Sequence, residues 1–414
     1  MGAVIPDLIK LVWQKSNQKG ITMNDITKSL LNLYGFKVLD VRGINPVEVK
    51  VDYIAPIMCP SCGSQVLRKK DQKERRIRHV SIGSRALILI LKTIKFCCAA
   101  CKKYFWQRFQ GVLPRMRNTE SFREQIADLH HKGITAKDLG LDHHLGHATV
   151  TRWYIHYLER KNLELKGAAM PKILGIDEHF FTKRRGYATT LCNLRTHRVF
   201  DVVLGRSEAS LEGFFRRCKG KDNVQVAVMD LSETYRNIIR KFLPKAMIVA
   251  DRFHVVRLVN HHFMATWKLL DPEGRRSIGL TKLMRQHEWN LRPDKHQKLQ
   301  RYLAHYPALQ VIYDFKQDLC RMLLLKRQNQ QQFQRIIPQF LAKIQALQFS
   351  IFPPLVTLGN TLQSWQEEIL RMLRFTKTNG ITEGFHNKME MMSRRAFGFR
   401  NFENYRLKVR VACA

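Results

Sequence analysis

The chain has 414 residues, enough for about two to four domains with buried cores. Its 71 Lys and Arg residues outnumber 34 Asp and Glu residues and give a formal net charge of +37 at pH 7. This excess predicts a polyanionic partner, most simply nucleic acid, because neutralised phosphates release counterions. A generally basic surface or a ribosome-associated protein is the alternative. Without a long apolar run or a secretory signal, we expect an intracellular protein that does not span a membrane.

Residues 1–112 are predicted to form an N-terminal region with a zinc ribbon. A period-two strand is expected at residues 47–53, and two further strands at 75–81 and 86–95. Two C-x-x-C motifs flank the latter strands: Cys59, Cys62, Cys98 and Cys101. Four thiolates on two tight turns match the tetrahedral ligand set of Zn²⁺; four unrelated buried thiols are the alternative. Cys97 adjoins the second motif and could replace Cys98 as a ligand.

Residues 117–162 are predicted to form a helix-turn-helix DNA-binding domain. Helices are expected at 121–132, at 136–139 and, after a break that begins at Gly140, at 147–161. Three polar residues share one face of the third helix and would contact DNA: Thr149, Arg152 and His156. Four other residues would pack inward: Val150, Tyr154, Tyr157 and Leu158. A generic helical linker is the alternative interpretation.

Residues 171–258 alternate short apolar strands with amphipathic helices, a pattern typical of βαβ units in an α/β fold. Two of the strands are expected at 187–193 and 198–204. Three further apolar runs each stop on an aspartate: 173–176 on Asp177, 224–229 on Asp230, and 246–250 on Asp251. Ligands of open α/β sheets bind at the carboxyl ends of the strands, so these aspartates are candidate functional residues.

The remainder of the chain is predicted to be helical. Residues 259–374 would form an all-helical insertion, in which the pair His261–His262 is a surface feature rather than a metal site. Residues 375–414 contain a final helix with two opposite stripes at 3.6-residue spacing. The apolar stripe comprises Phe385, Met389, Met392 and Ala396, and the polar stripe comprises Glu383, Asn387, Glu390 and Arg394. Glu383 is therefore expected to point away from the core.

Two strand-end aspartates and a helix-borne glutamate are hard oxygen donors, which Mg²⁺ or Mn²⁺ prefers. Two such ions about 3.5–4 Å apart can activate an attacking oxygen and stabilise the leaving oxygen at a phosphodiester. A single aspartate at a strand end is often only a turn or cap residue. The joint pattern of strand-end aspartates followed by a late glutamate favours a metal site.

Five segments resemble the insertion-sequence transposases of the ISL type (ISL-three): IDEH at 176–179, VMD at 228–230, ADRFHV at 250–255, NG-x-x-EG-x-x-N at 379–387 and RAFGF at 395–399. The resemblance implies a multidomain α/β fold. Its ribonuclease-H-like catalytic core is interrupted by the all-helical insertion and preceded by the zinc ribbon and the helix-turn-helix. It also implies that Asp177, Asp230 and Glu383 are the catalytic metal ligands. The role of Asp251 stays open, and Glu178 is a runner-up.

The implied function is transposition of DNA. The enzyme would bind the terminal inverted repeats, cleave at the element ends with water, and let the freed 3′-hydroxyl attack target DNA. Mg²⁺ (or Mn²⁺) and Zn²⁺ would be its cofactors, a homodimer would form in the synaptic complex, and the bacterial cytoplasm with its nucleoid DNA would be its location. Further DNA contacts are expected from Asn387, Arg394 and Arg395. The alternatives are an inactive DNA-binding regulator derived from a transposase and a related ribonuclease-H-like nuclease or resolvase.

Overall fold

The computed structural model describes five ranges of the chain: 31, 33–165, 167–375, 380–396 and 398–413. Asn379 and Phe397, which belong to two of the family-like segments, lie outside these ranges. The chain divides into two compact units, Met1–Tyr157 and Leu158–Ala414. Among the described residues, no helix is long and apolar enough to cross a membrane.

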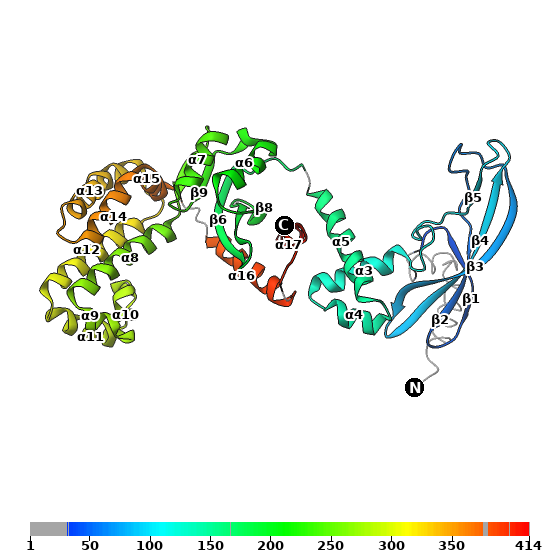
Figure 1. The fold of residues 1–414 in the computed structure, drawn as a ribbon, viewed down its shortest axis with the longest axis horizontal. Coiled ribbons are helices and arrows are strands. Elements are labelled where there is room, and N and C mark those ends of the chain that lie inside the picture. Colours follow the sequence, from blue (N-terminus) through cyan, green and yellow to red (C-terminus); the bar gives the residue numbers. More distant parts are fainter. Residues whose placement is uncertain (1–30, 32, 166, 376–379, 397, 414) are drawn as a thin grey trace, which may run out of the picture. The chain divides into compact units, whose positions relative to one another are not determined.

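The first unit contains a five-stranded sheet of order β1-β2-β4-β3, with β5 paired to β4 (Figure 1). The strands are β1 (Phe36–Arg42), β2 (Val47–Tyr53), β3 (Leu67–Ile82), β4 (Arg85–Cys98) and β5 (Tyr104–Trp106). The strand expected at 47–53 is confirmed, whereas those expected at 75–81 and 86–95 are parts of the longer β3 and β4. The additional residues of β3 are mostly charged and exposed. Backbone pairing with β4, rather than an apolar alternation, extends this strand.

Three helices follow in the chain: α3 (Glu120–Lys132), α4 (Ala136–His143) and α5 (His147–Glu164). The side chain of Thr119 caps the start of α3, and Gly133 ends that helix in the left-handed conformation, at a φ of 116°. The break expected from Gly140 is wrong, because α4 continues to its C-cap at His144. An interior glycine costs a helix only about 1 kcal/mol, which the burial of Leu139 against α3 and α5 offsets.

The second unit is organised around a five-stranded sheet of order β10-β9-β6-β7-β8. Its strands are β6 (Ile173–Thr182), β7 (Gly186–Asn193), β8 (Arg198–Leu204), β9 (Val226–Met229) and β10 (Met247–Ala250). The first three strands form an antiparallel meander, and β9 and β10 run parallel to β6. The intervening helices are α6 (Glu208–Arg217), the 3₁₀ turn η1 (Lys221–Asn223) and α7 (Glu233–Phe242). The strands and the helices pack together in one large apolar core.

The aspartates lie at two kinds of position in this sheet. β9 and β10 end directly before Asp230 and Asp251, as expected. The expectation that the first strand stops at Asp177 is wrong, because β6 continues to Thr182. The antiparallel partner β7 extends beyond the end of β9 and pairs Thr190 with Asp177, which keeps the strand extended past the aspartate.

In the described residues 252–374 every element is a helix. These elements are α8 (Arg252–Leu270), α9 (Pro272–Arg276), α10 (Ile278–Arg285), the 3₁₀ turn η2 (Glu288–Asn290), α11 (Pro293–Ala304), α12 (Pro307–Leu323), α13 (Gln330–Gln348), α14 (Pro353–Ser364) and α15 (Gln366–Arg374). Pro293, Pro307 and Pro353 each open a helix, where the missing N–H is not needed. The buried guanidinium of Arg252 ties α8 to this region by donating hydrogen bonds to three backbone carbonyls: Leu323 (3.0 Å), Leu325 (2.9 Å) and Met372 (2.8 Å).

The chain ends with α16 (Gly380–Arg395) and α17 (Phe402–Ala412). α17 lies along the edge strand β8, where the backbone N–H of Val199 donates to the carbonyl of Cys413 at 2.8 Å. Buried Asp201 on β8 accepts two hydrogen bonds from Arg406, at 2.6 and 2.7 Å, and lies 3.5 Å from Arg410. The C-terminal helix is therefore held by a charge pair as well as by apolar packing.

We expect the substitution Asp201→Asn to destabilise the second unit. Arg406 would lose its carboxylate partner while staying largely shielded from water. The cost should be about 2–3 kcal/mol, below that of a fully buried pair, because the Arg406 side chain is 29% exposed. Urea unfolding measures this cost. Asp222→Asn is the control, since its partner Lys245 is 75% exposed and such pairs contribute little. Equal shifts in the two variants would contradict the prediction.

Candidate active site

Two aspartates from neighbouring strands lie side by side where β9 ends. In the parallel pair β6 and β9, Ile176 is opposite Met229, so Asp177 and Asp230 directly follow paired residues. On the other side of β9, the in-register strand β10 brings Asp251 to the same edge. Strand register thus gathers three carboxylates that are far apart in the sequence.

Burial gives these carboxylates an environment that disfavours their charged forms. Asp177 is 8% exposed and Asp251 is 2% exposed. Desolvation, reinforced by neighbouring carboxylates, raises the pKa of Asp177 to about 7 and that of Asp230 to about 8. Oδ1 of Asp230 is buried and has no hydrogen-bond partner among the described residues. This set of crowded, desolvated oxygens fits a divalent cation, whose charge would favour the ionised carboxylates.

A histidine that the sequence analysis did not select joins this group. Nε2 of His254 lies 3.1 Å from Oδ1 of Asp230 and 3.8 Å from Oδ2 of Asp251. One potential ligand atom from each of Asp177, Asp230 and His254 lies within 4.8 Å of the others. Burial lowers the pKa of His254 to about 4, so its ring is neutral near pH 7. In the sequence, His254 follows Asp251 by three residues, and this spacing places the two side chains on the same side of the first turn of a helix.

Glu383 lies on α16, on the exposed stripe that the sequence predicts. Met389 and Met392 of the opposite stripe are buried, so the predicted two-sided character of this helix is confirmed. Glu383 is absent from the group of closely spaced ligand atoms in the described residues. Its charge nevertheless contributes to the raised pKa of Asp177, and α16 contacts β6, the strand that carries this aspartate.

A partly buried polar network docks α16 and α17 against the sheet beside Asp177. Oγ1 of Thr190 is hydrogen-bonded to Nε2 of His386 on α16 (3.1 Å) and to Nδ1 of His179 on β6 (2.9 Å). Nε2 of His179 is hydrogen-bonded in turn to the hydroxyl of Tyr405 on α17 (2.7 Å). Nδ1 of His386 lies 3.8 Å from Oδ2 of Asp177. The network connects the helix that carries Glu383 to the strand that carries Asp177.

Glu178, the runner-up ligand, is occupied by another partner. Arg206 donates to both of its carboxylate oxygens, at 2.9 and 3.1 Å. These two residues line an open cleft of about 740 Å³ beside Asp230. Arg257 and His261 of α8 line the same cleft and add positive or titratable groups, so its walls suit a phosphate-bearing strand.

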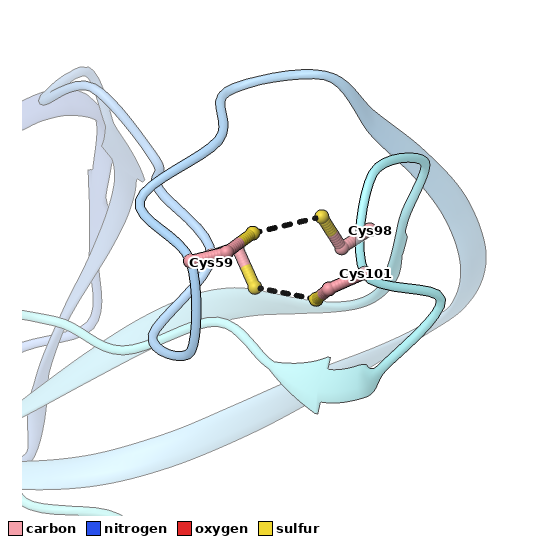
Figure 2. A group of neighbouring side chains, drawn as sticks. Cys59, Cys98 and Cys101 are labelled. Atoms are coloured by element: carbon pink, nitrogen blue, oxygen red, sulfur yellow. Dashed lines mark hydrogen bonds between the residues drawn. The ribbon is translucent and has the colours of Figure 1, made fainter.

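The four predicted zinc ligands form a second cluster, in the first unit. Figure 2 shows Cys59, Cys98 and Cys101 with their sulfurs turned toward one another. The Sγ–Sγ distances are 3.6 Å for Cys59 and Cys101 and 3.6 Å for Cys62 and Cys98. Sulfurs bound to one tetrahedral Zn²⁺ at about 2.3 Å would be about 3.8 Å apart, so the spacing fits zinc. Cys97 is not in the cluster, and its Sγ instead faces the carbonyls of Cys98 and Lys102.

Backbone N–H groups favour the ionised form of one thiol in this cluster. The N–H group of Cys101, more than that of Ala100, lowers the pKa of Cys98 to about 6. Thiolates are the form that binds zinc. All of the cysteines among the described residues are free of disulfides, which leaves these sulfurs available as ligands.

The six predicted DNA-contact residues lie on two helices. On α5, Arg152 and His156 are exposed and Thr149 is half-buried, while the inward positions Val150 and Tyr154 are buried. On α16, the three predicted contacts are all exposed: Asn387, Arg394 and Arg395. Arg394 is paired with Glu390 at 2.6 Å. Exposure makes these residues accessible to DNA.

Comparison with known proteins assigns the two regions that contain these clusters to one type of protein. Residues 174–409 match the family described as "Transposase", of the DDE type found in ISL3 insertion sequences. Residues 55–101 match the family described as the zinc-finger of transposase IS204/IS1001/IS1096/IS1165. The chain is also similar to the transposase for insertion sequence element IS1001 of Bordetella parapertussis, with 23% identity over 382 residues that cover 86% of this chain and 88% of that protein. These matches confirm the resemblance found in the sequence: the chain belongs to the ISL3-type family of DDE transposases and is the DNA transposase of an insertion sequence.

Proposed function

We propose that this transposase cuts DNA at the terminal inverted repeats of its element and joins the freed 3′-ends to target DNA, with Asp177, Asp230 and Glu383 as metal ligands. The observation that carries the proposal is the register of β6 and β9, which brings Asp177 and Asp230 together at one sheet edge. Paired carboxylates from adjacent strands suit the binding of two Mg²⁺ ions in a phosphoryl-transfer centre.

The strand order supports a ribonuclease-H-like core. An antiparallel meander, β6 to β8, is followed by two parallel strands on the other side of β6. In this proposal the helices of residues 259–374 are an insertion between the last strand of the core and α16. The insertion would separate the two strand-borne ligands from Glu383 in sequence while the core brings them to one centre.

The metal ions and several residues of the chain would have separate roles at this centre. The Mg²⁺ ions would activate the attacking oxygen and neutralise charge at the phosphodiester. Arg206 and Arg257 in the cleft beside Asp230 would bind the phosphates of the DNA strand. The pairing of Arg206 with Glu178 would orient the guanidinium, and the network through Thr190 would position α16.

The first unit would recognise the inverted repeats. The zinc cluster would hold the end of the β3–β4 hairpin, and α5 would enter the major groove with Thr149, Arg152 and His156. Asn387, Arg394 and Arg395 would contact DNA near the catalytic centre. Because two element ends must be joined together, a homodimer would form the synaptic complex on bacterial chromosomal DNA.

We expect Asp230→Asn and Glu383→Gln to abolish cleavage and joining of a labelled inverted-repeat end with Mg²⁺. Loss of a metal ligand should reduce the rate by at least about 10²-fold, since a bound ion contributes several kcal/mol to the transition state. Binding to the same DNA should be retained. Gel-resolved cleavage and strand-transfer products measure the rate, and an electrophoretic shift measures binding.

Glu390→Gln is the matched control for Glu383→Gln, because both glutamates are exposed on α16. Glu390 is paired with Arg394 and is not a proposed metal ligand. It should keep wild-type cleavage and joining. Cleavage without joining by the wild-type enzyme would indicate a nuclease or resolvase instead. Full activity of Glu383→Gln would refute the assignment of that ligand.

The zinc content of variants at two adjacent cysteines tests which sulfurs of the second cluster bind the ion. Cys98→Ser should lose the zinc ion, because its sulfur belongs to the four-sulfur cluster, whereas Cys97→Ser should retain it. Elemental analysis of the purified full-length proteins gives the zinc-to-chain ratio. Cys98→Ser should also lower affinity for the inverted repeat. Equal zinc content in the two variants would contradict this ligand assignment.

A further inference from the structure

The inference concerns the side chain of His254, and it rests on the proposed function of the aspartate pair as a metal centre. His254 lies in the first turn of α8, directly after β10 and Asp251. Arg252, two residues earlier, is anchored by the carbonyls of Leu323, Leu325 and Met372. Positions two apart on a helix differ by about 200° around its axis. The anchoring of Arg252 on one side therefore fixes His254 on the other side, which faces the aspartates.

The distances around His254 are those of ligands that share one ion. Its Nε2 lies 3.1 Å from Oδ1 of Asp230, and one atom of each of Asp177, Asp230 and His254 lies within 4.8 Å of the others. Ligands at about 2.1 Å from an octahedral ion are about 3.0 Å apart when adjacent and about 4.2 Å apart when opposite. An ion between these three atoms needs little rearrangement.

A simple hydrogen bond between His254 and Asp230 does not account for their approach. Oδ1 of Asp230 is buried and lacks a hydrogen-bond partner in the described part of the chain, although the imidazole nitrogen is only 3.1 Å away. The orientation of the two groups is therefore unsuited to a hydrogen bond. A cation between them would be bound by both the nitrogen and the carboxylate oxygen, and would satisfy that oxygen.

We propose that His254 is a direct ligand of the metal ion held by Asp177 and Asp230. In the proposed two-ion centre Glu383 then serves the second ion: it is not in the close group with Asp230, and its helix α16 contacts β6, the strand that carries Asp177. The two ion positions thus differ in chemistry, one with an imidazole and one with oxygen donors. An imidazole ligand raises the preference of its position for Mn²⁺ over Mg²⁺.

The test is pulsed electron paramagnetic resonance of Mn²⁺ bound to the full-length, zinc-loaded protein. The wild type should show the modulation of a directly coordinated ¹⁴N nucleus, which changes to that of ¹⁵N when only histidine is labelled. The signal should vanish in His254→Gln. Mn²⁺ affinity should fall at least about tenfold in that variant. The isotope-labelled wild-type protein tests histidine ligation directly, so this part of the test does not depend on whether a variant folds.

Two other histidines are the matched controls. His261→Gln changes an exposed imidazole two turns further along α8, in the same cleft, and His386→Gln changes the imidazole beside Asp177. Both should keep the nitrogen signal. A signal that survives in His254→Gln, or that is lost only in His386→Gln, would overturn the inference.

The experiment also separates this inference from the proposed function. Ligation by His254 would be refuted, and the aspartate centre left intact, by two results together. Mn²⁺ binding would be lost in Asp230→Asn, and Mn²⁺ bound to the wild type would show no nitrogen coupling. Mn²⁺ binding that is unchanged in Asp230→Asn would refute the metal centre itself, and the role of His254 with it.

Discussion

The parallel pairing of β6 with β9 is the constraint on which the candidate site depends. Ile176 opposite Met229 sets the positions of Asp177 and Asp230, and both apolar residues are buried. Crowding carboxylates at a desolvated edge is unfavourable, as their raised pKa values show. Apolar packing of the sheet supplies the free energy that holds them there, and a divalent cation would offset the repulsion that remains.

The net charge of +37 overstates the number of cations available to DNA. Arg252 is buried and donates to backbone carbonyls, and Arg406 is paired with Asp201. Lys316 is also buried: its Nζ donates to the carbonyl of Met284 at 3.0 Å, and burial lowers its pKa to about 8. Arg252 and Lys316 fix helices to one another, and Arg406 fixes α17 to β8. Arg410 of the same helix also lies near Asp201, at 3.5 Å, so the basic residues of α17 are not all available to DNA.

Much of the architecture could be predicted because it depends on local pattern. Apolar runs predicted the strands that precede Asp230 and Asp251, the 3.6-residue stripes predicted the exposure of Glu383, and cysteine spacing predicted the four-sulfur cluster. Features set by a distant partner were missed. The charged half of β3 is a strand only because β4 pairs with it, and β6 passes Asp177 only because β7 continues its ladder. His254 was missed for the same reason, because only the fold brings it close to Asp230, which follows β9.

The two sides of the candidate centre are held by different kinds of interaction. Asp177, Asp230 and His254 are fixed by strand register and by a helix anchored through Arg252, all within one apolar core. Glu383 depends on α16, whose contact with the sheet includes the hydrogen bond between His386 and Thr190. Thr190 also binds His179, and His179 binds Tyr405 of α17, so the docking of α17 influences the helix that carries Glu383. The position of Glu383 is therefore coupled to the C-terminal helix, whereas the aspartate pair is determined by the sheet.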